Sequence, residues 1–173
     1  MNEVLKAIRE RRSIRKYKGE QIKNEELNLI LEAGIWAPTG MGKQSPVIVP
    51  VQDTETIAYL EKWNAEIMGN PDARPFYGAP TVVTVLADGE NYNWLRDGSL
   101  VMGNLMLAAH SLGIGSCWIN RCQEFFDMPE GKDLLKKWGL DEKFRGVAFC
   151  ILGYAEGDAP APKERKADYI HRV

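Results

Sequence analysis

The sequence is poor in residues that build metal sites and disulfide frameworks, since its 173 residues include three cysteines and two histidines. The cysteines, Cys117, Cys122 and Cys150, are odd in number and lie in or beside apolar segments. This pattern predicts buried free thiols in a reducing cytoplasm. The histidines, His110 and His171, lie far apart in the sequence. We therefore expect no metal site, which would need closer clustering of its ligands.

Long apolar runs and a strong charge imbalance are also missing. No apolar run approaches the length of a membrane-spanning helix, and the charged segment 1–12 lacks the apolar core of a signal peptide. The formal net charge of −2 argues against a general nucleic-acid binder. Basic residues nevertheless gather near both ends of the chain: Arg9, Arg11, Arg12, Arg15, Lys16 and Lys18, then Lys163, Arg165 and Lys166. Two such clusters predict a compact anionic ligand rather than a polymer.

The common catalytic motifs are absent as well. There is no Gly-x-Ser-x-Gly elbow, no P-loop and no His-Glu-x-x-His. Gly113-Ile-Gly115 resembles the start of a dinucleotide fingerprint, but Trp118 occupies the third glycine position and the segment runs from helix into strand. The two histidines have no evident partner for a catalytic triad. We assign no catalytic side chain, so any reaction would depend on a cofactor.

Hydrophobic periodicity indicates a single mixed α/β domain that spans residues 1–173. It predicts helices over 2–12, 24–37, 54–68, 93–112 and 129–138, and strands over 47–51, 81–87, 116–120 and 146–154. The remainder, 155–173, is a polar tail. The first strand comes late in the chain, unlike that of a Rossmann domain, which opens with a strand.

The longest expected helix, 93–112, is rich in small residues: Gly98, Ser99, Gly103, Ala108 and Ala109. Small residues allow another backbone to approach a helix closely. The partner could belong to the same subunit or to a second copy across a dimer, and both interpretations remain open.

The segment Arg11-Arg12-Ser13-Ile14-Arg15 lies where a helix gives way to extended chain. Alternation along an extended segment would send Arg11, Ser13 and Arg15 to one side. Two guanidinium groups and a hydroxyl on one face suit a phosphate, because arginine offers forked donors that match its oxygens. Taken alone, the segment is explained more simply as a solvated basic turn.

Three further segments could contact a ligand, although each has an ordinary explanation. Lys163-Glu164-Arg165 repeats the alternating basic pattern but lies in a polar tail. Gly40-Met41-Gly42 would allow a backbone to approach a flat ligand closely, or would form a plain turn. Gly113-Ile-Gly115 could aim backbone N–H groups at a ligand, or could simply link a helix to a strand.

Taken together and in order, these motifs resemble the FMN-dependent nitroreductase family. The resemblance covers nearly the whole chain, from Val4 to about Ile170. It rests on an Arg-Arg-Ser-x-Arg-x-Tyr start, Ala37-Pro38-Thr39-Gly40 leading to Gln44, Tyr77-Gly78-Ala79-Pro80, Leu112-Gly-Ile-Gly-Ser-Cys-Trp-Ile119 and Lys163-x-Arg165.

The resemblance implies an α+β fold with a central, mostly antiparallel sheet flanked by helices. It also implies an interlocked homodimer that binds FMN at its interface, with the tail 155–173 contacting the partner subunit. We expect the protein to bind a small molecule and to bind neither nucleic acid nor membranes.

Site residues are carried over position by position from the same resemblance. The flavin-binding motif would be Arg11, Arg12, Ser13 and Arg15, and the phosphate pair Lys163 and Arg165. The loop that the partner lays against the flavin would be Pro38, Thr39, Gly40 and Gly42, leading to Gln44. Gly115 and Ser116 would bring backbone N–H groups near flavin N5 and O4. The family commonly has Asn where this chain has Gly42, which removes a side-chain hydrogen bond to the flavin.

The implied activity is ping-pong hydride transfer. NADH or NADPH would reduce the flavin at N5 and leave, and a nitroaromatic, quinone or enone would then accept the hydride in the same place. Three alternatives remain: a flavin dehydrogenase or dehalogenase specialised for one metabolite, a non-enzymatic FMN-binding protein, and an α/β interaction domain without a cofactor.

Overall fold

The computed structural model describes residues 1–173 as one four-stranded sheet covered by helices on both faces. The strands are β1 (Pro46–Val51), β2 (Thr81–Asp88), β3 (Gly115–Ile119) and β4 (Phe144–Gly153). The helices are α1 (Glu3–Glu10), α2 (Asn24–Ile35), α3 (Thr54–Ile67), α4 (Trp94–Ser111), α5 (Cys122–Asp127) and α6 (Pro129–Lys137), with 3-10 turns η1 (Gly40–Gly42) and η2 (Ala167–Tyr169).

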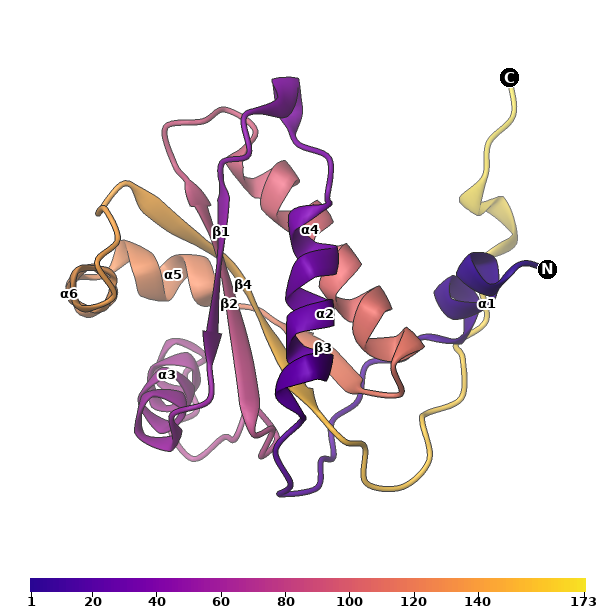
Figure 1. The fold of residues 1–173 in the computed structure, drawn as a ribbon, viewed down its shortest axis with the longest axis horizontal. Helices are drawn as coiled ribbons and strands as arrows, with labels where there is room; N and C mark the ends of the chain where they lie inside the picture. Colours follow the sequence, from indigo (N-terminus) through magenta and orange to yellow (C-terminus); the bar gives the residue numbers. More distant parts are fainter.

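The sheet has the order β1-β2-β4-β3, and every neighbouring pair is antiparallel. Figure 1 shows α2 and α4 on one face, and α3, α5 and α6 on the other. Each face has its own hydrophobic core, of 16 and 15 buried residues respectively. The predicted α+β fold with an antiparallel sheet between helices is confirmed.

The central strands β2 and β4 explain why the sheet is covered on both sides. In β2, Val83 and Val85 pack in the core beneath α2 and α4, while Val82 and Leu86 pack in the opposite core. Successive side chains of a strand point to opposite faces, so an uninterrupted apolar run gives a strand buried on both. A register shift between Val85 and Leu86 interrupts the pairing with β4.

The sequence pattern did not indicate helix α5, which follows β3 almost directly. The helix is six residues long, too short to display a helical period. Its Phe125 and Phe126 are nevertheless fully buried, and their rings meet at a centroid distance of 4.9 Å. Tertiary packing of two adjacent aromatic side chains therefore stabilises a helix that local periodicity could not reveal.

The two ends of the chain lie outside both cores. Helix α1 contains no buried residue, and every residue from 156 to 173 is exposed. In Figure 1 both termini project on the same side of the molecule, away from the sheet. No helix is both long enough and apolar enough to cross a membrane.

Candidate functional site

The fold brings the basic N-terminal motif against β3. Ser13 forms a parallel bridge with Ser116, and the Ile14 N–H donates to the Ser116 carbonyl at 3.0 Å. A Cβ added at Gly115 would lie 3.1 Å from both the Ile14 Cβ and the Gly153 carbonyl oxygen. Glycine is therefore needed at this position so that the two segments can approach closely.

We call the place where Ser13 and Ile14 pair with Ser116 the β3 junction. Arg11 presents an unpaired guanidinium nitrogen beside it. Its Nη1 atom is buried and has no hydrogen-bond partner within the chain. The guanidinium is close enough to lower the pKa of Cys150, although burial has the larger effect and raises that pKa to about 12. A buried cationic donor without an acceptor is costly, so an anionic group at this position would remove a substantial penalty. The geometry therefore fits a phosphate ligand.

The other two arginines of the motif point elsewhere. Arg12 Nη1 donates to the carbonyls of Arg9 and Arg11, at 2.7 and 2.8 Å, and so satisfies the C-terminal end of α1. Arg15 is exposed and lines a cavity on the α3 side of the sheet. The sequence predicted that Arg11 and Arg15 face one ligand. In this structure a single ligand would contact both side chains only if it extended across the end of β3.

The predicted flavin loop is compact and strained. Thr39 Oγ1 accepts from the Gln44 N–H at 3.0 Å, and the Gly42 N–H donates to the Thr39 carbonyl at 3.0 Å. Met41, Gly42 and Gln44 all have positive φ, at 54, 64 and 48°. Such conformations cost about 1–3 kcal/mol at a non-glycine residue and cluster at functional sites. The loop backbone is thus shaped by more than its local sequence preferences.

Asp97 holds this loop against α4, a role that the sequence reading missed. Its side chain is 3% exposed, and Oδ1 accepts from the Gly40 N–H at 3.0 Å. A Cβ added at Gly40 would collide with the Asn93 side chain. Asp97 shares the buried helix face of Val101 and Leu105, at i+4 and i+8. In the sequence, the signal for this role is an acidic residue on an otherwise apolar stripe of the helix.

The loop and the β3 segment contact different turns of α4. The loop contacts Asp97, whereas Ser116 Oγ lies 3.5 Å from the carbonyl oxygen of Met106, farther along the same helix. At 1.5 Å per residue, the two contact points are about 14 Å apart along the helix axis. One protomer therefore does not bring its own loop to the Gly115–Ser116 backbone.

The basic pair of the tail is also not brought to the N-terminal motif within the protomer. Lys163 and Arg165 are exposed, and no hydrogen bond or ion pair joins residues 157–173 to the rest of the chain. The last anchor is Glu156, whose N–H donates to the Lys16 carbonyl at 3.0 Å and whose carboxylate pairs with Lys16 Nζ at 3.3 Å.

Comparison with known proteins identifies the family to which the chain belongs. The Nitroreductase family model matches residues 8–81 and 71–154. The chain belongs to the nitroreductase family. An Archaeoglobus fulgidus protein named for NADH dehydrogenase/NAD(P)H nitroreductase is 32% identical over 99% of this chain and 98% of its own length.

Solved nitroreductases superpose closely on the whole chain. A nitroreductase with bound FMN from Bacteroides fragilis has a TM-score of 0.91 and 33% identity, and covers 100% of both chains. A second with bound FMN, from Desulfitobacterium hafniense, has a TM-score of 0.88 and 31% identity over 100% of this chain and 99% of its own.

The small residues on α4 divide between two roles in this nitroreductase-family chain. A Cβ at Gly98 would collide with Val147, and Ala109 is fully buried, so both serve packing within the protomer. Gly103 is exposed, and a Cβ there would meet no atom within 4 Å. Part of the α4 surface is therefore left uncovered by the protomer itself.

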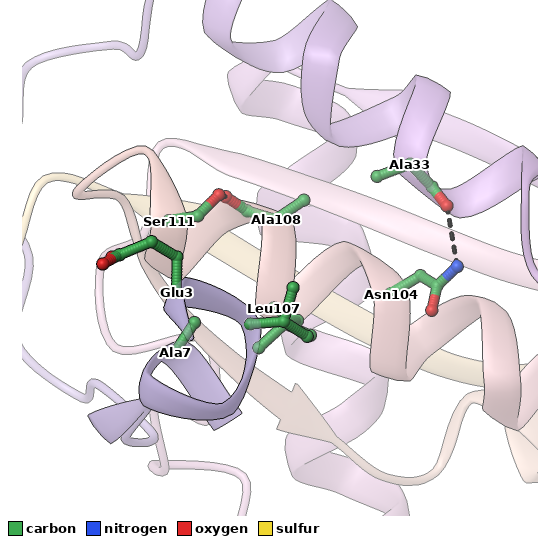
Figure 2. A pocket seen from close by; sticks show the side chains of 8 residues that line it. Glu3, Ala7, Ala33, Asn104, Leu107, Ala108 and Ser111 are labelled. Carbon is green, nitrogen blue, oxygen red and sulfur yellow. Dashed lines mark hydrogen bonds between the residues drawn. The ribbon is translucent and has the colours of Figure 1, made fainter. Parts of the chain in front are cut away.

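A groove of about 320 Å³ runs beside this surface, between α1, α2 and α4. Figure 2 shows Glu3 and Ala7 of α1 facing Leu107 and Ser111 of α4 across it. Farther along α4, the Asn104 side-chain amide donates to the Ala33 carbonyl at 2.9 Å and ties α4 to α2.

Burial raises the pKa values of two groups near the β3 junction, Tyr17 and Cys150. Burial raises the pKa of Tyr17 above its ordinary value, and the Tyr17 hydroxyl donates to the Ile14 carbonyl at 2.7 Å. Cys117 and Cys150 are buried free thiols, as the sequence predicted for all three cysteines. No group of three or more His, Cys, Asp or Glu side chains is placed to hold a metal ion.

Proposed function

We propose that this chain is an FMN-dependent oxidoreductase that transfers hydride from NADH or NADPH to a small organic acceptor. In this proposal the acceptor is a nitroaromatic, a quinone or an enone, and the protein acts in the cytoplasm. The observation that carries the proposal is the buried, unpaired Nη1 of Arg11 beside Ser13 and Ser116, in a chain of the nitroreductase family.

The residues of the β3 junction suit a flavin nucleotide. Arg11, Ser13 and Arg15 would hold the phosphate, with Lys163 and Arg165 adding charge from the tail. Gly115 and Ser116 are buried where Ser13 and Ile14 pair with β3, so they would position the N-terminal motif for the phosphate. FMN, when bound, supplies a carrier that accepts a hydride from one substrate and gives it to the next.

The working unit in this proposal is a homodimer with shared flavin sites. The loop at Pro38–Gln44 contacts Asp97, about 14 Å along α4 from the Met106 carbonyl that Ser116 contacts, so a second copy would supply the loop to each site. Large apolar side chains stand exposed on the elements that would meet this copy: Val4, Leu5, Ile8, Leu29, Ile35, Trp36, Leu95, Leu100, Tyr169 and Ile170. An exposed apolar set of this extent is typical of a protein interface.

The decisive measurement is an absorbance spectrum of the purified protein, followed by anaerobic addition of NADH and then NADPH. We expect a flavin spectrum that bleaches with one or both nucleotides. Arg15→Ala should weaken FMN binding by about 1.5–3 kcal/mol if it removes a charged hydrogen bond to phosphate. An unchanged flavin titration would remove Arg15 from the site, and a monomeric mass with full flavin would contradict the shared-site arrangement.

Gly42 gives specific support to a second candidate, a protein that binds FMN without turnover. It stands where the family commonly has Asn, its φ is +64°, and a Cβ there would meet nothing within 4 Å. Asn tolerates this conformation, so Gly42→Asn should fold normally and tighten FMN binding. Flavin that binds but is reduced by neither nucleotide would favour this candidate. Slow turnover of nitroaromatics beside fast turnover of one metabolite would instead favour a specialised dehydrogenase or dehalogenase.

A further inference from the structure

Helix α3 carries a buried amide, Asn64, that contacts the end of β3. The Asn64 side chain is 1% exposed, and its Nδ2 donates to the Asn120 carbonyl at 2.7 Å. Its Oδ1 is buried and has no hydrogen-bond partner within the chain. A buried acceptor left unpaired is costly, and an apolar side chain of similar size would avoid that cost. Core packing therefore does not explain the amide, whereas the carbonyl that it holds does.

The contact with Asn64 fixes the direction of the next N–H group along the chain. The chain has no cis peptide bond, and in a trans peptide the C=O and the N–H point in opposite directions. Since the Asn120 carbonyl faces Asn64, the Arg121 N–H points away from α3. It donates to no acceptor within the chain. This N–H group is therefore available to a ligand.

The peptide between Asn120 and Arg121 is also held by other contacts and by an unusual backbone conformation. Trp118 Nε1 donates to Asn120 Oδ1 at 2.6 Å, so the side chain of Asn120 is held as well as its carbonyl. Arg121 has a φ of 71°, which is costly at a residue other than glycine. Such a conformation persists only where surrounding contacts impose it, and the contact from Asn64 is one of them.

A second polar side chain of α3 does the same for a neighbouring segment. Glu61 lies one turn before Asn64, and its carboxylate accepts from the Phe76 N–H at 2.9 Å. Tyr77, the next residue, also has a positive φ, of 53°. Tyr77 and Arg121 line the same cavity, to which Arg15 of the predicted flavin motif belongs. Helix α3 thus supports both walls of the predicted flavin site from behind.

We propose that Asn64 is a positioning residue of the flavin site: it orients the peptide after Asn120 so that the Arg121 N–H donates to the bound flavin ring. The inference rests on the proposed function, because FMN is the ligand that the N-terminal motif would hold. A donor fixed in advance stabilises the negative charge that develops on the ring when it is reduced. Asn64 contacts no ligand itself and acts through the backbone.

The test measures the midpoint potential of bound FMN by anaerobic reductive titration against a reference dye. Asn64→Leu keeps the approximate size of the side chain but removes the donor. Reduced FMN should then lose about tenfold in affinity relative to oxidised FMN. For a two-electron couple this is a fall of about 30 mV in the midpoint potential. Asn64→Gln, which keeps an amide at this position, should restore part of the loss.

Leu60→Ala is the matched control, because Leu60 is also 1% exposed and lies one turn before Asn64 on α3. It should lower the free energy of unfolding without changing the midpoint potential. If Asn64→Leu fails to fold, Asn64→Ala replaces it with the same expected fall in potential. An unchanged potential in the Asn64 variants would overturn the proposal, and so would an equal fall in Leu60→Ala.

A second measurement needs no flavin. The indole N–H signal of Trp118 in nitrogen–proton NMR spectra of the full chain reports the hydrogen bond to Asn120. Asn64→Leu should shift this signal before FMN is added, because Asn120 is no longer held, and Leu60→Ala should leave it in place. An unmoved Trp118 signal in Asn64→Leu would overturn the proposed orientation of the peptide.

The two proposals fail in different ways. A protein that binds no FMN would refute the proposed function, and with it any role of the Arg121 N–H toward flavin. A protein that binds FMN and transfers hydride, but whose midpoint potential is the same with and without the Asn64 amide, would keep the proposed function and refute the positioning role alone.

Discussion

The central strands and the chain ends differ in how much the rest of the protomer covers and supports them. Strands β2 and β4 are almost wholly buried and are supported on both faces by helices of the same protomer. Helix α1 has no buried residue, and the tail beyond Glu156 makes no hydrogen bond or ion pair with the rest of the chain.

The difference shows where the protomer is complete and where it is not. The proposed phosphate ligands Arg11, Lys163 and Arg165 all belong to the poorly supported ends of the chain. The centre is supported within the protomer, whereas we propose that a second copy, a cofactor or both support the ends. The following experiments test this contrast.

The largest effect is expected in the sheet. Phe149→Ala removes a fully buried ring that packs on Phe76 and Phe126, at centroid distances of 5.3 and 6.4 Å. It should lower the free energy of unfolding by about 3–5 kcal/mol, at every protein concentration, in urea denaturation. Tyr169→Ala in the exposed tail is the matched aromatic control, and its cost should fall as the protein is diluted. If both substitutions lowered the free energy of unfolding equally and at every protein concentration, the proposed difference between the sheet and the chain ends would be wrong.

Thiol reactivity should differ between the buried central strands and the exposed tail. Burial raises the pKa of Cys150 to about 12, so at pH 8 its thiolate should be about a thousandfold rarer than that of an exposed cysteine. An aromatic disulfide reagent should therefore modify an introduced Ala161→Cys at once and leave native Cys150 unmodified, as read by mass spectrometry. Comparable rates at the two positions would mean that β4 opens readily or that the tail is covered.

Arg11 and Arg12 are neighbours with different expected effects. Arg11→Ala removes the buried unpaired donor and should weaken FMN binding by about 1.5–3 kcal/mol in a flavin titration. Arg12→Ala removes two contacts with carbonyls at the end of α1 and should instead lower stability by about 0.5–1.5 kcal/mol. Reversed effects would assign the phosphate to Arg12.

The most local effect concerns Asp97, which anchors the loop. Asp97→Ala leaves the Gly40 N–H without its acceptor and should cost about 1–2 kcal/mol of local stability. Hydrogen exchange at the Gly40 amide should accelerate accordingly. Asp97→Asn, which keeps an acceptor oxygen, should give slower exchange than the alanine variant. Unchanged exchange in Asp97→Ala would show that the loop is held by other contacts.

Much of the fold could be predicted from the sequence because its signals were local. The valine-rich run 81–87 and the apolar stripe of 93–112 gave β2 and α4 nearly to their observed limits. Helix α5 could not be predicted because six residues cannot show a period, and the role of Asp97 could not because the Gly40 N–H that it accepts from is 57 residues away in the sequence. Arg74 and Arg121, which line a cavity together with the predicted Arg15, were also missed, because neither belongs to a basic motif.

The sequence by itself determined the helices and strands other than α5, the buried thiols and the family, because these depend on periodicity, composition and motif order along one chain. The tertiary structure decided the rest. It joined Ser13 to Ser116, turned Arg12 back to its own helix while leaving Arg11 unpaired, and placed the loop and Ser116 against different turns of α4. Such relations depend on how distant segments pack against the sheet, which no local pattern encodes.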